Sequence, residues 1–282
     1  MRKIGFIDYY LDEWHANNYP RWIRESRAGR SGAVLAYAWG ERDSPGGVSS
    51  ASWGGQYGAE VCGSIEELCE KSDFLLILAP DNSEKHLEYA ARVLPYGKPC
   101  YIDKTFAPTL AEAVEIFALA EKYGTPLCSS SALRFAQEIG EFNGGALSVI
   151  SSGGGPSFAT YAVHQMEMIV KAMGTGAEKV MALMNGGNKS LAIRFRDGRG
   201  ALFNQAAGSS APFTVSIEAG GKTEYRPIES DFFRAFIENL LIFYETGKVL
   251  APKEETLSVI SLIEAGERAL AEPFRWIGVP GQ

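Results

Sequence analysis

The charged pair Asp103-Lys104 directly follows a short β-rich run, Cys100–Ile102, in the middle of the chain. A Thr-Phe-Ala-Pro turn comes next, and a helical stretch opens at Thr109. In an open α/β sheet, ligands bind at the carboxyl ends of the strands, so the pair falls where chemistry is expected. Local composition alone favours the alternative, a solvated charged turn.

A second pair with chemical potential is His164 and Glu167, in a stretch whose apolar residues have helical spacing. Residues three apart share neighbouring surface on a helix. Histidine changes charge near neutral pH and is a natural general base. The alternatives are a helix histidine that is satisfied by its neighbours, and an ion pair between Glu167 and Lys171 at i+4.

The elements before residue 130 alternate between apolar runs and helical stretches. Continuous apolar runs suit parallel strands that are buried on both faces. Ser64-x-x-Glu67 resembles a capping box, and Gly97 and Gly124 stand where helices should stop. We expect strands at 3–7, 33–39, 74–79, 100–102 and 126–129, and helices at 14–29, 64–71, 83–94 and 109–123. This alternation predicts βαβ units and an N-terminal Rossmann-like, doubly wound parallel sheet.

The second half has a different pattern. The stretch 149–155 runs into three consecutive glycines and precedes a helix, strands are expected at 180–185, 191–196, 201–205 and 213–219, and closing helices are expected at 231–248 and 253–271. Asp197-Gly198 is a strong hairpin turn between two of these strands. We expect a Rossmann-like nucleotide-binding domain at 1–128 and, at 129–282, a C-terminal α/β domain with an antiparallel sheet. One face of that sheet would be available for a substrate or a partner subunit.

Composition narrows the function classes. The chain of 282 residues has a net charge of −7, which disfavours nucleic-acid and acidic-membrane partners. No apolar run approaches the roughly 20 residues of a membrane span, and Asp8 interrupts the N-terminus too early for a signal peptide. The four cysteines lack Cys-x-x-Cys spacing, which indicates buried thiols in a reducing compartment. We expect a cytoplasmic protein without a metal site.

The turn after the first strand lacks the glycines that let a backbone approach a pyrophosphate. Tyr9 and Tyr10 would obstruct that approach, and Asp12 and Glu13 would repel phosphate, although both suit a helix dipole without a ligand. Residues 40–58 are rich in glycine and serine, which predicts a mobile loop. Within this loop, Glu41 and Asp43 are either ribose ligands or, as their context favours, surface charges.

Several motifs in order resemble the Gfo/Idh/MocA oxidoreductases. The resemblance is good over residues 57 to 135 and looser elsewhere. Residues 79–88 look like the family's Thr-Pro-Asn-x-x-His-x-Glu with one residue inserted, and 97–104 like Gly-Lys-His-Val-x-x-Glu-Lys-Pro. Leu133-Arg134-Phe135 matches Asn-x-Arg-Phe, and the three glycines at 153–155, with His164 and Glu167, match Gly-Gly-Gly and Asp-x-Gly-x-His-x-x-Asp. Thr105 replaces the proline, and Thr160 and Ala162 replace the Asp and the Gly.

This resemblance implies a mostly antiparallel open sheet in the second domain. It also implies an NAD- or NADP-dependent enzyme that acts on a sugar-like or polyol substrate by hydride transfer. Lys104 and His164 would handle the proton, with Asp103 in the place of the family's glutamate. The residues implied at the cofactor are Asp8, Tyr9, Ala79, Pro80, Asn82, Asp103 and Lys104. Those implied at the substrate are Arg134, Thr160, His164 and Glu167. His86 is expected to have a structural role at a helix start.

Two functions remain open at this point. The first is a Gfo/Idh/MocA-type oxidoreductase that takes a small-molecule substrate and forms a homo-oligomer through the C-terminal sheet. The second is a cofactor-free relative that binds a ligand or regulates and has lost dinucleotide binding. Lys104 and His164 favour the first function, and the acidic first turn favours the second.

Overall fold

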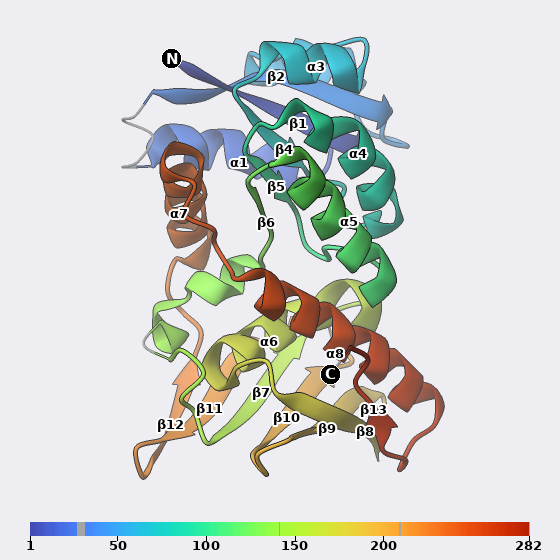
Figure 1. Cartoon of the computed structure of the whole chain (residues 1–282), viewed down its shortest axis with the longest axis vertical. Coiled ribbons are helices and arrows are strands. Elements are labelled where there is room, and N and C mark those ends of the chain that lie inside the picture. Colours follow the sequence, from blue (N-terminus) through green and yellow to red (C-terminus); the bar gives the residue numbers. More distant parts are fainter. Residues whose placement is uncertain (27–31, 141, 209, 282) are drawn as a thin grey trace. The chain divides into compact units, whose positions relative to one another are not determined.

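The computed structural model describes residues 1–26, 32–140, 142–208 and 210–281 and divides into two compact units (Figure 1). The first unit comprises residues 1–107, 111–130 and 234–252. The second comprises residues 108–110, 131–233 and 253–282. A single boundary after residue 128, as expected from the sequence, does not include the return of residues 234–252 to the first unit.

The first unit contains a six-stranded sheet in the order β3-β2-β1-β4-β5-β6, and all neighbouring strands are parallel. The predicted doubly wound sheet is confirmed. Its strands are β1 (Arg2–Tyr10), β2 (Ala33–Arg42), β3 (Glu60–Val61), β4 (Phe74–Ile77), β5 (Cys100–Ile102) and β6 (Leu127–Cys128). Its helices are α1 (Trp14–Glu25), α2 (Ser50–Tyr57), α3 (Ile65–Lys71), α4 (His86–Val93) and α5 (Leu110–Tyr123), and the 3-10 turn η2 (Ser83–Lys85) precedes α4.

The centre of this sheet determines where a ligand site is expected. Strands β1 and β4 are neighbours at the point where the strand order reverses, which is where ligands bind in doubly wound sheets. Phe6 and Ile7 on β1 and Leu76 and Ile77 on β4 are fully buried, as expected of parallel strands covered on both faces. The carboxyl ends of β1, β4 and β5 therefore bring Asp8, Ala79 and Asp103 to one edge of the sheet.

Three predictions for this unit were wrong in detail. Strand β1 continues through Tyr10, because Asp8 and Tyr10 pair with Gly40 and Arg42 of β2. The stretch 40–58, expected to be a mobile loop, contains the end of β2 and helix α2. Trp53, whose side chain is fully buried, anchors α2 despite its two glycines. The predicted helix 14–29 ends at Glu25, and residues 27–31 lie outside the described part of the chain.

The second unit contains a seven-stranded sheet in the order β12-β11-β7-β10-β9-β8-β13. The pairing of β7 with β10 is parallel and the other pairings are antiparallel, so the mostly antiparallel sheet is confirmed. The strands are β7 (Ser148–Gly154), β8 (Ala177–Asn185), β9 (Asn188–Phe195), β10 (Gly200–Ala206), β11 (Thr214–Ala219), β12 (Lys222–Pro227) and β13 (Ile277–Gly278). The Asp197-Gly198 turn joins β9 to β10, and Gly198 has a φ of 88° that suits glycine.

Helices α6 (Phe158–Met173) and α8 (Lys253–Ala271) cover one face of this second sheet (Figure 1). They pack so closely that a side chain at Gly266 would meet Phe158 and Leu191. Most of α7 (Phe232–Thr246) belongs to the first unit, where Tyr244 stacks on Phe74 and donates to Leu75 O. Among the described residues, no helix has the length and apolar content needed to cross a membrane.

Candidate active site

The carboxyl of Asp8 links the two central strands of the first sheet. Its Oδ1 accepts the N–H of Tyr9 at 2.7 Å and the N–H of Ala79, just beyond β4, at 3.0 Å. Ala79 has a left-handed φ of 48°, which costs about 1 kcal/mol for a residue with a Cβ. Burial, followed by the repulsion of Glu13, holds the pKa of Asp8 well above its usual value. The edge of the sheet thus carries a buried carboxyl group that resists ionisation.

Glu13 occupies the N-terminus of α1. Its side chain is the N-cap of the helix and accepts the backbone N–H groups of His15, at 2.7 Å, and Ala16. These N–H groups are the donors with which a Rossmann helix N-terminus would bind phosphate. In this chain a carboxylate from the same turn satisfies them, which also suits the helix dipole.

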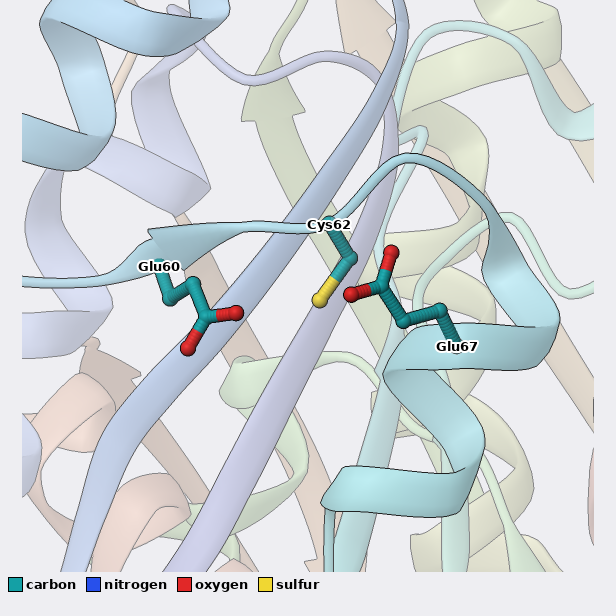
Figure 2. A group of neighbouring side chains, drawn as sticks. All are labelled: Glu60, Cys62 and Glu67. Atoms are coloured by element: carbon teal, nitrogen blue, oxygen red, sulfur yellow. The ribbon is translucent and has the colours of Figure 1, made fainter.

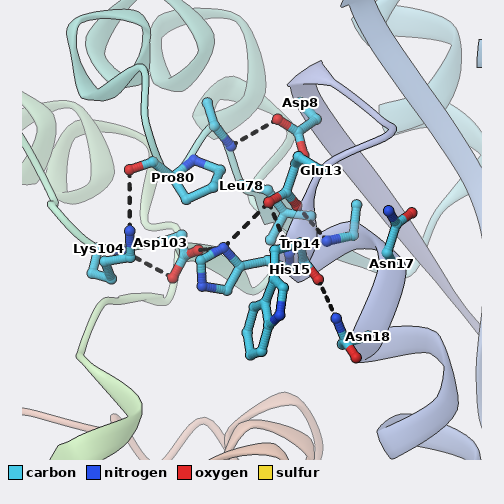
Figure 3. Close-up of polar contacts among 12 residues, drawn as sticks. Asp8, Glu13, Trp14, His15, Asn17, Asn18, Leu78, Pro80, Asp103 and Lys104 are labelled. Carbon is cyan, nitrogen blue, oxygen red and sulfur yellow. Dashed lines mark hydrogen bonds and ion pairs between the residues drawn. The ribbon is translucent and has the colours of Figure 1, made fainter. Parts of the chain in front are cut away.

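His15 lies between two carboxylates (Figure 3). Its Nδ1 is 3.4 Å from Glu13 Oε2 and 3.5 Å from Asp103 Oδ2. Among the described residues, His15 Nδ1, Asp103 Oδ2 and Asp8 Oδ2 are buried atoms without a hydrogen-bond partner. Figure 3 shows these side chains converging from the ends of β1 and β5 and the start of α1. The result is a buried cluster of acidic groups around one imidazole.

Asp103 and Lys104 are both buried at the end of β5, at 1% and 6% exposure, so the solvated-turn alternative is wrong. Asp103 Oδ1 accepts the Tyr101 hydroxyl and the Lys104 N–H, each at 2.8 Å. Lys104 Nζ donates to Pro80 O at 3.2 Å. An ammonium group held at a strand end by one carbonyl can stabilise negative charge that develops on a ligand oxygen.

The other residues implied at the cofactor make contacts within the first unit. Tyr9 packs edge-on against Tyr10, and Arg42 and Lys85 lie over its ring at 5.6 and 5.7 Å. Asn82 Nδ2 donates to Glu84. His86 is fully buried, with Nδ1 3.0 Å from Phe106 O and Nε2 2.8 Å from Leu78 O, which is a structural role.

The two acids considered as ribose ligands are also engaged. Glu41, near the end of β2, accepts the Tyr89 hydroxyl at 2.6 Å and pairs with Lys85 at 3.1 Å. Asp43 accepts the N–H and the hydroxyl of Ser50 at the start of α2. Asp12 ties the same region to the first turn through the Val48 N–H, at 2.9 Å.

A pyrophosphate could reach the N–H groups of this first turn only after the Glu13 side chain releases them. Glu13 accepts two of the helix N–H groups, the carboxyl of Asp8 is buried next to Glu13, and β1 continues through two tyrosines. A phosphate would meet negative charge where the fold normally offers backbone N–H groups. The lysine at the end of β5 is, by contrast, where chemistry is expected.

A separate cluster in the second unit contains His164. Its Nδ1 lies 2.8 Å from Ser131 Oγ, and its ring packs edge-on against Tyr161 and Phe213. Ser131 precedes the 3-10 turn η4 (Ala132–Phe135) and caps it by accepting the N–H of Leu133 at 3.2 Å. The imidazole of His164 is thus positioned by the Ser131 hydroxyl and by the two aromatic rings that it contacts.

Arg134 and Glu167 form a buried ion pair beside this histidine. Arg134 Nη1 is 3.0 Å from Glu167 Oε1, and Arg134 Nη2 donates to Glu255 of α8 at 2.5 Å. Burial raises the pKa of Glu167, and Arg134 partly offsets the rise. Lys171 Nζ donates to the backbone oxygen of Arg134. Since Glu167 pairs with Arg134 rather than Lys171, the i+4 ion pair considered above is wrong.

The structure therefore groups Asp8, Pro80, Asp103 and Lys104 in the first unit and Arg134, His164 and Glu167 in the second. Thr160 lies half-buried one turn before His164 on α6. The sequence did not single out Ser131 or Glu255. The capping pattern Ser131-x-Leu133 is a signal for the first, whereas the pairing of Glu255 with Arg134, 121 positions apart, had none.

One group of possible metal ligands occurs among the described residues: Glu60, Cys62 and Glu67 (Figure 2). Lys71 already places its ammonium 2.6 Å from both carboxylates. Burial, the largest cause, raises the pKa of the Cys62 thiol to about 11, so it is protonated near neutral pH. This group is a poor metal site, and the expected absence of a metal stays a prediction.

Comparisons with known proteins add a context for these clusters. No protein-family model matches the sequence. The uncharacterized oxidoreductase YhhX of Escherichia coli (strain K12) is 37% identical over 71 residues. This match covers 25% of the present chain and only 21% of that relative.

Solved structures match over the whole chain. A probable dehydrogenase from Thermotoga maritima has 14% identity and a TM-score of 0.80, with 98% of each chain covered. GenD2 from gentamicin A biosynthesis, in complex with NAD, has 14% identity and a TM-score of 0.79, with 99% of this chain and 97% of that chain covered. An oxidoreductase from Agrobacterium radiobacter, in complex with NAD⁺, L-tartaric acid and magnesium, has 14% identity and a TM-score of 0.75, with 99% and 98% covered. At these identities the likenesses show a shared fold, which is the fold that the resemblance to the Gfo/Idh/MocA oxidoreductases implied.

Proposed function

We propose that the protein is an oxidoreductase of the Gfo/Idh/MocA type that acts on a sugar-like or polyol alcohol or on the corresponding carbonyl. The observation that carries this proposal is the buried Lys104, held by Pro80 O at the carboxyl end of a central strand. NAD or NADP is the favoured redox partner, because solved structures with this fold contain NAD.

In this proposal the chain's own residues stabilise charge and move a proton. Lys104 would stabilise the oxygen of the substrate as negative charge develops on it. His164 would share the handling of the hydroxyl proton with Lys104. A bound nicotinamide would supply the hydride chemistry. Glu167 and Arg134 would hold the segment that carries His164.

A second candidate function is favoured by Glu13. The Glu13 carboxylate accepts the N–H groups of His15 and Ala16. A side chain of the protein itself therefore occupies the position at which a helix N-terminus would bind an anion. A cofactor-free relative that binds a small ligand would have this property. The two functions differ in one measurable quantity, the affinity for dinucleotides.

Calorimetric titration with NAD⁺, NADH, NADP⁺ and NADPH tests both candidates. The wild type is compared with Glu13→Ala and with Glu25→Ala, a control at the exposed end of the same helix. If the wild type binds any of the four, the oxidoreductase is supported, and Lys104→Met and His164→Gln should each lower turnover of a responsive sugar or polyol at least about 100-fold.

The remaining outcomes favour the second function. Binding that appears only in Glu13→Ala would mean that Glu13 closes the natural protein to dinucleotides. If no variant binds any dinucleotide while the protein is folded, the NAD(P)-dependent enzyme is excluded.

A further inference from the structure

Ser131 and His164 constrain each other through one hydrogen bond. Ser131 Oγ lies 2.8 Å from His164 Nδ1 and accepts the Leu133 N–H at 3.2 Å. The Ser131 side chain is completely buried. A hydroxyl has one hydrogen to donate, and a buried hydroxyl that fails to donate it loses free energy.

The direction of this bond follows from the contacts of Ser131. In the described parts of the chain, His164 Nδ1 is the one acceptor within hydrogen-bond distance of Ser131 Oγ. The carboxylate of Glu167 is engaged elsewhere, by Arg134 and, at 3.5 Å, by the Ser131 backbone N–H. The free energy of the buried hydroxyl therefore favours a Ser131 hydrogen that points at Nδ1, and this direction places the proton of a neutral imidazole on Nε2.

We propose that Ser131 is a positioning residue that fixes neutral His164 as its Nε2–H tautomer. His164 then meets a substrate oxygen as a hydrogen-bond donor, so in the carbonyl-reducing direction of the proposed function it polarises the oxygen while the Lys104 ammonium gives that oxygen its proton. The use of His164 as a base would require the Ser131–His164 bond to reverse, which would leave the hydroxyl hydrogen of Ser131 buried without an acceptor. This assignment rests on the proposed function only for its consequence in catalysis, because the tautomer itself is a property of the free protein.

Nitrogen NMR of the histidine side chains tests the tautomer directly. The chain has three histidines, so long-range ¹H–¹⁵N spectra are simple, and His164→Gln identifies the signals of His164. At a pH where His164 is neutral, we expect Nδ1 to resonate as an unprotonated nitrogen and Nε2 as a protonated one. A wild-type spectrum with the proton on Nδ1 would overturn the proposal.

Variants of Ser131 test the cause. Ser131→Ala should produce a mixture of tautomers and raise the pKa of His164, because the neutral form loses one hydrogen bond. Ser131→Thr keeps the hydroxyl and should restore the wild-type spectrum. Ser130→Ala is the matched control, because the buried Ser130 hydroxyl has no partner among the described residues. An unchanged tautomer in Ser131→Ala refutes the role of Ser131.

The catalytic consequence has its own readout. If an oxidoreductase activity is found, Ser131→Ala should move the pH profile of kcat/KM in parallel with the pKa of His164, and Ser131→Thr should move it back. A profile that stays fixed while the NMR signals change would separate Ser131 from catalysis. If no activity is found, the NMR result still decides the tautomer, so failure of the proposed function and failure of this assignment are distinguishable.

Discussion

Asp8 illustrates how one side chain couples the sheet to pH. Its carboxyl is buried beside Glu13, and both causes raise its pKa in the folded protein. In the unfolded chain an aspartate ionises near pH 4. As pH rises through that value, the unfolded state gains a charge that the folded state still resists. Asp8 therefore lowers stability as pH rises from about 4 through its folded pKa.

We predict that Asp8→Asn makes the protein more stable at pH 7 by about 1–2 kcal/mol, with little difference at pH 4. The amide oxygen can still accept the N–H groups of Tyr9 and Ala79, and the amide nitrogen can donate towards Glu13. Urea unfolding at several pH values measures the effect. Asp81→Asn, an exposed neighbour at the same strand end, should leave the pH dependence unchanged. A loss of stability in Asp8→Asn that is equal at every pH would contradict the prediction.

The residues of the candidate site were predictable to different degrees. Asp103 and Lys104 were expected at a strand end because a short β-rich run stops directly before them. The acidic residues of the first turn are also visible in the sequence, which predicts that Glu13 suits the helix dipole. That Glu13 accepts the His15 and Ala16 N–H groups could be predicted only if the first residue of α1 were known, because this bond is made by the N-cap residue. Neither the His15–Asp103 approach nor the Ser131–His164 bond leaves a local pattern, since each joins residues far apart in sequence.

At the scale of elements, α2 shows how tertiary contacts override propensity. Its sequence has two glycines and three serines near or within the helix, which disfavour helix in isolation. Ser49 caps it, and Trp53 packs on Tyr57 and donates its indole N–H to Asn17 at 2.8 Å. The burial of this one indole thus stabilises a helix that its own sequence disfavours.

We predict that Trp53→Ala lowers the free energy of unfolding by about 3–5 kcal/mol and speeds amide hydrogen exchange at residues 50–57. Trp53→Phe keeps a ring but loses the bond to Asn17, so its effect should be smaller. Mass-spectrometric hydrogen exchange measures the local effect and denaturant unfolding the global one. Exchange in α2 that stays as slow as in the wild type would show that Trp53 is not its anchor.

The strands show why the fold was easier to predict than its details. Continuous apolar runs mark β1 and β4, because the central residues of these strands are buried on both faces. Tyr9 and Tyr10 break that pattern, so the end of β1 was missed. Strand β12 has an exposed sequence, Lys222–Pro227, without alternation, and the two-residue β13 is too short for any periodicity. Their pairing partners, rather than their own residues, make them strands.

For the whole molecule, the sequence predicts a homo-oligomer through the C-terminal sheet. Ile150 of β7 and Leu202 of β10 are paired neighbours that keep 47% and 42% exposure on the face that α6 and α8 leave uncovered. Their neighbours in sequence, Val149 and Phe203, are buried on the opposite face. An apolar strip on an open sheet suits association between identical copies.

We predict that Ile150→Glu and Leu202→Glu each lower the mass measured by size-exclusion chromatography with light scattering. Stability of the folded chain should change by less than about 1 kcal/mol, because both side chains are already exposed. Val114→Glu, on α5 and 48% exposed, is the control for adding a charge elsewhere. A wild type that is already monomeric, or a mass that neither substitution changes, would refute association through this face.

The return of residues 234–252 to the first unit has a consequence for synthesis. The six strands of that unit are all made before residue 131, yet Tyr244, which stacks on Phe74 and bonds to the backbone of β4, is translated only after the whole of residues 131–233. A nascent chain released at residue 130 would carry a finished sheet with one side of Phe74 bare. Folding from the N-terminus, the usual order on the ribosome, leaves the first unit incomplete until residues 234–252 have been made. We expect nascent chains that lack residues 234–252 to bind chaperones, and chains extended past residue 252 to escape them.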